Sequence, residues 1–142
     1  MQVCKTCVPP VPNEGETLQE NCSPQTPTKY MISEYGSARG VDAMKAQLYM
    51  HGPIGCGIEA TPMFDAYTGG IYEEYIAYPQ INHEIAVVGW DVAEDGTEYW
   101  IGRNSWGTPW GIDGFFYMKM HENNLGIETD CDWGIPVLPT ED

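Results

Sequence analysis

The sequence has few basic residues and no long apolar run. Six Lys and Arg stand against 21 Asp and Glu, which gives a formal net charge of −15. A surface of this sign repels the phosphates of nucleic acids and of anionic membranes, so neither is expected as a partner. No apolar stretch approaches the roughly 18 residues that a membrane-spanning helix needs. With 42% hydrophobic residues, the chain is nevertheless expected to be globular.

Cysteine is scarce, but its pattern is informative. The five cysteines are Cys4, Cys7, Cys22, Cys56 and Cys131. In a disulfide-containing protein, an odd number leaves a free thiol or a bond to a partner outside the chain. The cysteines favour an exported protein, whereas the start of the sequence shows no signal peptide. We therefore expect the chain to be part of a longer protein.

Short elements separated by turns are predicted, because 16 Gly and 11 Pro are spread along the chain. Residues 1–30 are predicted to be a proline-rich loop segment and residues 31–142 a single sheet-rich unit. Apolar residues at helical spacing predict a helix over 41–50, which Gly52-Pro53 ends. The pattern further predicts strands over 54–60, 85–92, 99–103 and 115–120, a helical turn at 63–67 and coil over 131–142. One main helix followed by antiparallel strands is an α+β arrangement.

Three polar residues, Asn82, His83 and Glu84, stand at the entrance of the apolar run that ends at Trp90. A histidine in this place commonly caps a strand and bonds to a carbonyl group, so His83 alone does not indicate a site. An active role needs a group that fixes the ring tautomer and a nucleophile to activate. Asn104 is the candidate for the first, because an antiparallel hairpin would bring the start of one strand near the end of the next.

The register of that hairpin can be tested against the side-chain faces. A two-residue turn centred on Asp95-Gly96 would pair Asn104 with Val87. Val87 is an even number of residues from His83, so His83 and Asn104 share a face of the sheet. Strict pairing would still leave them about 13 Å apart at about 3.3 Å per residue. A wider loop or a β-bulge is therefore required to bring the two side chains together.

The stretch "NSWGTPWG", residues 104–111, is unusually rich in tryptophan and glycine for an exposed loop. Trp106 lies two residues after Asn104 and could cover an Asn–His hydrogen bond, which would strengthen the bond by excluding water. Alternatively, the loop is a glycine-rich connection whose tryptophans fill the core.

Together these motifs resemble the papain-like cysteine proteases. The resemblance is carried by "GPIGCGI", "YTGGIY", "NHEIAVVGW" and "EYWIGRNSWGTPWG", and it runs from Cys4 to about Val137. It implies the C-terminal, or right-hand, lobe of the papain-like fold, an antiparallel sheet or partial barrel with one main helix. Residues 1–30 would then be a disulfide-bearing segment between the lobes.

The resemblance assigns roles by position. His83 is similar to the catalytic histidine, Asn104 resembles the asparagine that orients it, and Trp106 matches the tryptophan that shields both. Gly57 and Glu84 fall where the family lines its second substrate subsite. Glu84 departs from the apolar residue that commonly follows the histidine. It is either a solvated acid at the strand edge or a determinant of preference for basic side chains.

The nucleophile of the family is absent from this sequence. The catalytic cysteine stands roughly 130 to 150 residues before the histidine, whereas Cys4 and Cys7 precede it by only about 80 residues and lack the surrounding motif. They resemble structural cysteines between the lobes. The resemblance implies disulfides Cys7–Cys22 and Cys56–Cys131, with the partner of Cys4 in an N-terminal lobe. A zinc site at Cys4, Cys7 and Cys22 is the weaker alternative, because no fourth ligand stands out.

The function implied is hydrolysis of peptide bonds in peptide or protein substrates by a thiol protease without cofactor or metal. The intact enzyme would be monomeric and lysosomal, endosomal or secreted, and its N-terminal lobe would be the partner of this chain. Without the nucleophile, the chain alone is expected to be inactive. Two alternatives stay open: a truncated homologue that acts as a binding module, and a disulfide-stabilised structural domain.

Overall fold

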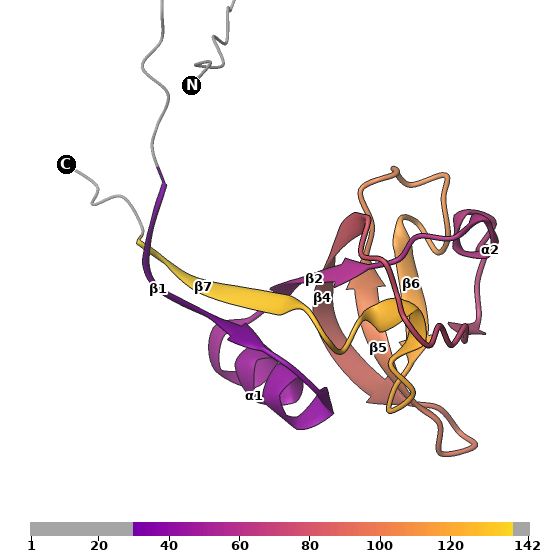
Figure 1. The fold of residues 1–142 in the computed structure, drawn as a ribbon, viewed down its shortest axis with the longest axis horizontal. Helices are drawn as coiled ribbons and strands as arrows, with labels where there is room; N and C mark the ends of the chain where they lie inside the picture. The colour runs from indigo at the N-terminus through magenta and orange to yellow at the C-terminus, as the bar shows by residue number, and fades with distance from the viewer. Residues whose placement is uncertain (1–29, 138–142) are drawn as a thin grey trace, which may run out of the picture. The chain divides into compact units, whose positions relative to one another are not determined.

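The computed structural model describes residues 30–137, and Figure 1 shows their fold. The predictions for residues 1–29, including the Cys7–Cys22 disulfide, the partner of Cys4 and the zinc alternative, lie outside this range. The elements are β1 (Met31–Ala38), α1 (Val41–His51), β2 (Ile54–Ile58), α2 (Pro62–Asp65), β3 (Ile71–Tyr72), β4 (His83–Val92), β5 (Glu98–Arg103), β6 (Phe115–Lys119), the 3-10 turn η1 (Asn124–Gly126) and β7 (Cys131–Val137).

The strands of this region form one open, mixed sheet in the order β1-β7-β2-β4-β5-β6-β3. The pairs β2–β4, β2–β7, β4–β5 and β5–β6 are antiparallel. The short strand β3 pairs parallel to β6, which departs from the antiparallel prediction. One main helix and a predominantly antiparallel sheet confirm the predicted α+β class.

Helix α1 forms where the apolar spacing predicted it. Met44 and Leu48 lie one turn apart and are buried in the core. Gly40 precedes the helix and Gly52 follows it, with φ of 77° and 89°, and the Gly52 N–H donates to the Leu48 carbonyl. These backbone conformations favour glycine, and Pro53 prevents the helix from continuing.

The prediction of coil over 131–142 is wrong for residues 131–137, which form β7. Gly134 and Pro136 weaken the local strand signal, but the strand is made by distant contacts. Cys131 lies opposite Cys56 of β2, and the two form a disulfide. Strand β1 was likewise not predicted, and it lies next to β7 at the end of the sheet. Local sequence patterns do not encode pairing over such separations.

A mostly apolar core packs against the sheet and includes one buried carboxylate. Trp100 is fully buried, and its indole N–H donates to Glu128 Oε1 at 3.1 Å. The backbone N–H of His121 donates to the same oxygen at 2.9 Å. Two donors therefore compensate the burial of Glu128.

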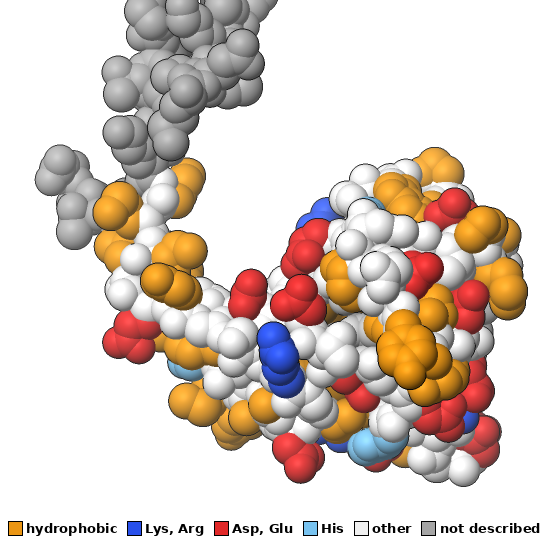
Figure 2. Space-filling model, viewed as in Figure 1, with side chains coloured by type: hydrophobic (Ala, Val, Ile, Leu, Met, Phe, Trp, Pro, Cys, Tyr) orange, Lys and Arg blue, Asp and Glu red, His pale blue; other side chains and the backbone are white. Residues whose placement is uncertain are grey.

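The surface bears the acidic composition of the sequence. Figure 2 shows many acidic side chains and few basic ones on the face in view. None of the helices in the described part of the chain is long and apolar enough to cross a membrane.

Candidate active site

The hairpin β4–β5 brings His83 and Asn104 together. His83 is the first residue of β4, and Asn104 follows the last residue of β5. Two features close the distance that a two-residue turn would leave. Val92 pairs with Glu98, so the loop is wider, and the register shifts between Val87 and Gly89 at a bulge. Together they move Asn104 two residues toward His83, and an even shift preserves the shared face.

A short hydrogen bond joins the two side chains. The distance from His83 Nε2 to Asn104 Oδ1 is 2.8 Å, and the Ser105 N–H donates to the same Oδ1 at 2.8 Å. The Ser105 donor identifies this atom as the amide oxygen, so Nε2 of His83 must carry the proton in this bond. In the neutral ring, Nδ1 is therefore the basic nitrogen.

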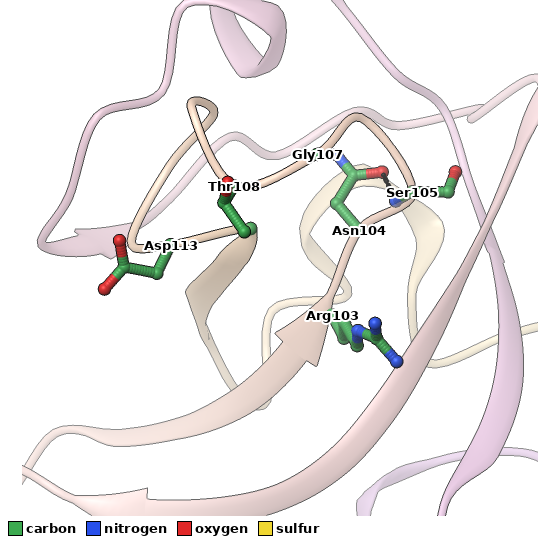
Figure 3. A pocket seen from close by; sticks show the side chains of 7 residues that line it. Arg103, Asn104, Ser105, Gly107, Thr108 and Asp113 are labelled. Carbon is green, nitrogen blue, oxygen red and sulfur yellow. Dashed lines mark hydrogen bonds between the residues drawn. The ribbon is translucent and has the colours of Figure 1, made fainter.

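Asn104 itself is held by the backbone. It is only 7% exposed, and its N–H donates to the Gly114 carbonyl at 2.9 Å. Its side-chain Nδ2 is buried and has no acceptor among the described residues. In Figure 3 the amide oxygen faces Ser105, while the nitrogen is turned toward Gly107. Residues 103–105, 107, 108, 113 and 114 line a cavity of about 200 Å³ at this place.

Trp106 covers the histidine. Its ring stacks on the His83 imidazole with centroids 4.8 Å apart and planes 26° apart. Phe64 and Trp110 contact Trp106 from behind, with centroid distances of 6.0 and 5.1 Å. The Trp106 side chain thus separates the histidine from solvent on one side and is anchored to the core on the other. Trp106 thus stacks on His83, while Trp110 packs against the core residue Phe64.

Asn82 makes contacts beside His83 that the sequence did not reveal. Its Oδ1 accepts from the Ala60 N–H at 2.8 Å, and its own N–H donates to the Ile58 carbonyl at 3.1 Å. These bonds tie the start of β4 to the end of β2. The only sequence signal was the polar character of Asn82, which does not disclose a partner 22 residues away.

The Gly57 and Glu84 positions are opposite each other in the β2–β4 pair. A Cβ atom on Gly57 would lie 2.5 Å from Ile81 Cγ2, so a larger residue at this position would require the Ile81 side chain to move. Partial desolvation and the carboxylates of Asp130 and Asp132 raise the pKa of Glu84. Repulsion among the three acids thus outweighs the opposing effect of the nearby histidine.

A second cavity, of about 340 Å³, connects the Glu84 and Asn104 positions. Its lining residues are Glu84, Ile85, Ala86, Arg103, Asn104 and Ser105. His83 does not line this cavity.

The described residues contain two cysteines, Cys56 and Cys131, and both are in the disulfide. Within residues 30–137 there is therefore no thiol that His83 could activate. The same region contains no group of three or more His, Cys, Asp or Glu side chains arranged to hold a metal ion.

His83 lies at the start of the central strand β4, where Asn104 orients its ring and Trp106 covers it. This arrangement in an α+β lobe is the architecture expected of the papain-like class of hydrolases. The model of the papain family cysteine proteases matches residues 5–135. The chain therefore belongs to the papain family of cysteine proteases.

Individual relatives agree with this assignment. The chain is 48% identical over 118 residues to cathepsin Z of Onchocerca volvulus, covering 78% of this chain and 38% of that protein. It is 37% identical over 106 residues to cathepsin B-like cysteine proteinase 6 of Caenorhabditis elegans, covering 75% and 28%. Within the family, the sequence "GTEYWIGRNSWGTPWG" and the cysteines of "GPIGCGI" and "IETDCDWG" also favour cathepsin Z. The chain spans less than half the length of these relatives.

Solved structures show the same fold. Procathepsin L 3 of the Tenebrio molitor larval midgut has a TM-score of 0.66 at 28% identity, covering 86% of this chain and 40% of that one. The bromelain protease of Ananas comosus, solved with the E64 inhibitor, has a TM-score of 0.70 at 24% identity, covering 80% and 55%.

Proposed function

We propose that this chain supplies the histidine base and its orienting asparagine to a cysteine peptidase whose nucleophile lies outside the chain. The observation that carries the proposal is the 2.8 Å bond from His83 Nε2 to Asn104 Oδ1. It commits Nε2 to the asparagine and makes Nδ1 the proton acceptor. Trp106 supports this arrangement by covering one face of the ring.

The chemistry follows from these positions. His83 Nδ1 takes the proton of a cysteine thiol, and the resulting thiolate attacks the carbonyl carbon of a peptide bond. The imidazolium then gives its proton to the leaving amine, and the carbon–nitrogen bond breaks to leave an acyl-enzyme. Nδ1 next takes a proton from water, whose oxygen attacks the thioester carbonyl carbon, and the carbon–sulfur bond breaks to release the acid and the thiolate. The proton returns to sulfur.

A chimera tests the role of His83. The part of Onchocerca volvulus cathepsin Z that aligns with residues 30–137 is replaced by those residues, and cleavage of a fluorogenic peptide is measured. We expect activity that His83→Ala lowers by at least about 100-fold, the scale of general acid–base catalysis. His121→Ala is the matched control, because His121 is exposed and pairs with Glu98 away from Asn104. Equal activity of the His83→Ala chimera and its parent would refute the proposal.

The 142-residue chain alone is proposed to be inactive, because no described residue supplies a thiol. It should not cleave the fluorogenic peptide, and turnover that a thiol alkylator blocks would contradict this. The alternative function, a binding module without catalysis, predicts a chimera that folds and binds peptide but remains inactive.

Glu84 is proposed to favour basic side chains in the substrate subsite that it forms with Gly57. The nearby Asp130 and Asp132 carboxylates, which raise the pKa of Glu84, support the proposal by adding negative charge. In the chimera, Glu84→Ala should lower cleavage of substrates with a basic side chain relative to apolar ones. Glu94→Ala, in the exposed turn, is the control. An unchanged ratio in Glu84→Ala would count against this role.

We further propose that the intact protein works in a lysosomal, endosomal or extracellular compartment. The disulfide between Cys56 and Cys131 supports an oxidising site of folding.

A further inference from the structure

Helix α2 packs against Trp106, which stacks on His83, and against Trp110. Phe64, at its centre, is fully buried and contacts both Trp106 and Trp110. The Trp110 indole N–H also donates to the Asp65 carbonyl at 2.9 Å. The position of the Trp106 ring, and therefore its stacking on His83, depends on where α2 lies.

A helix of four residues does not hold its own conformation in water, so α2 needs outside support. Its N-cap is Thr61, whose Oγ1 accepts from the Phe64 N–H at 3.1 Å. The Thr61 hydroxyl donates its single proton to Glu74 Oε2 at 2.7 Å. Because this donation fixes the hydroxyl rotor, it turns an oxygen lone pair toward Phe64.

Hydrogen bonds hold both the carboxylate and the backbone of Glu74. The Tyr72 hydroxyl donates to the same Oε2 atom, and the hydrogen bond together with the larger effect of burial raises the pKa of Tyr72 to about 12. The Glu74 N–H donates to Asn124 Oδ1 at 2.8 Å, and the Glu74 carbonyl accepts from the Leu125 N–H at 3.0 Å. Asn124 is fully buried, so the backbone of Glu74 is anchored to the interior.

We propose that Glu74 is a positioning residue that holds the Trp106 ring over His83 through Thr61 and Phe64. The chain of contacts runs from the carboxylate to the helix cap, from the cap to the buried phenyl ring, and from that ring to the tryptophan. Its relevance to catalysis rests on the role proposed for His83. The position of the two rings, however, can be measured without turnover.

The test is the NMR spectrum of the His83 ring protons in the 142-residue chain. The stacked indole shifts these resonances by its ring current, and Trp106→Ala gives their values without it. Glu74→Ala should move the shifts by at least half of the way to the Trp106→Ala values. Glu74→Gln keeps an oxygen acceptor for Thr61 and should retain the shifts of the unaltered chain.

Two further variants separate positioning from general loss of structure. Thr61→Val removes the hydroxyl and should displace the His83 shifts as Glu74→Ala does, whereas Thr61→Ser keeps the cap and should not. If Glu74→Ala does not fold, Thr61→Val decides the question. The control is Glu73→Ala, because the exposed Glu73 pairs with Lys119 instead. Unchanged shifts in Thr61→Val, or equal displacement by Glu73→Ala, would overturn the proposal. The activity of the His83→Ala chimera tests the proposed role of His83 as the base, and its outcome is independent of these ring-proton shifts.

Discussion

One acceptor atom and one aromatic ring define the state of His83. Asn104 Oδ1 holds the proton on Nε2, and Trp106 stacks on the ring. Because exclusion of water strengthens a hydrogen bond, removal of the indole should weaken it even though both partners remain. Trp106→Ala is therefore expected to speed the exchange of the His83 Nε2 proton with solvent, measured as broadening of its NMR resonance.

Two further substitutions serve as an intermediate case and a negative control. Trp106→Phe keeps a stacked ring and should exchange at an intermediate rate. Tyr78→Ala removes an aromatic ring that is exposed at the surface and should have no effect. Equal exchange rates in Trp106→Ala and Tyr78→Ala would show that the indole does not protect the bond.

Glu84 makes stability depend on pH in a direction that can be derived. Desolvation and the Asp130 and Asp132 carboxylates raise its pKa above the ordinary value in the folded state. The folded chain therefore binds more protons at this group than the unfolded chain does, between the ordinary pKa and the raised one. By linkage, the contribution of Glu84 to the free energy of unfolding falls as pH rises through that window.

Glu84→Gln removes this titration and should be stabilising relative to the unaltered chain above the window. The difference between the two should shrink as the pH is lowered below it, as measured by urea unfolding at several pH values. Glu98→Gln is the contrasting variant, because hydrogen bonds from Lys45 and His121 lower the pKa of Glu98. Because Glu98→Gln removes a carboxylate whose pKa is lowered by folding, this substitution should destabilise the fold most at higher pH. A difference for Glu84→Gln that grows toward acid pH would contradict the prediction.

The sequence predicted the shared face of His83 and Asn104 but not the distance between them. The face follows from the two-residue period of a strand, which any even change of register preserves. The distance depends on loop width and on the bulge near Val88, and neither has a distinct signal in the sequence. Asn82 and Glu74 could not be found for a similar reason, since their partners are distant backbone and hydroxyl groups.

At the level of elements, the pairing of β5 with β6 requires a glycine at position 102. Gly102 lies opposite Phe116, and a Cβ atom on Gly102 would be only 2.1 Å from the Phe116 ring. Phe116 is fully buried and contacts Phe64 edge-on, so the ring has little room to move. Gly102→Ala should lower the free energy of unfolding by about 1–3 kcal/mol, the usual cost of overpacking a core.

Gly89 of β4 is the matched control, because no atom lies within 4 Å of the place where its Cβ would be. Gly89→Ala should leave the stability nearly unchanged in the same denaturant titration. A Gly102→Ala variant as stable as Gly89→Ala would mean that the Phe116 ring can move aside to accommodate the added methyl group.

The elements predicted from sequence are those whose signal is local. Helix α1 has its apolar spacing and its terminating glycine and proline, and β4 and β5 are apolar runs around a turn. Strand β7 instead depends on β2, to which the Cys56–Cys131 disulfide joins it across 75 residues. The sheet order, in which β7 stands between β1 and β2, likewise arises from pairing between remote segments.

For the whole molecule, the excess of acidic residues sets a prediction about salt. With 21 Asp and Glu against six Lys and Arg, most charges in the folded chain repel one another. Salt screens such repulsion, and the screening length falls to about 10 Å at about 0.1 M. The midpoint of urea unfolding at pH 7 should therefore rise as sodium chloride is increased from about 0.01 M to about 0.1 M, a range that screens charges strongly.

Attractive pairs oppose this trend, and one of them supplies the control. Lys45 contacts Glu98 at 2.7 Å, and salt weakens that pair as well. Lys45→Gln removes the attraction and makes the chain more acidic, so its midpoint should rise with salt more steeply than that of the unaltered chain. A midpoint that falls with salt in both proteins would show that local ion pairs outweigh the net charge.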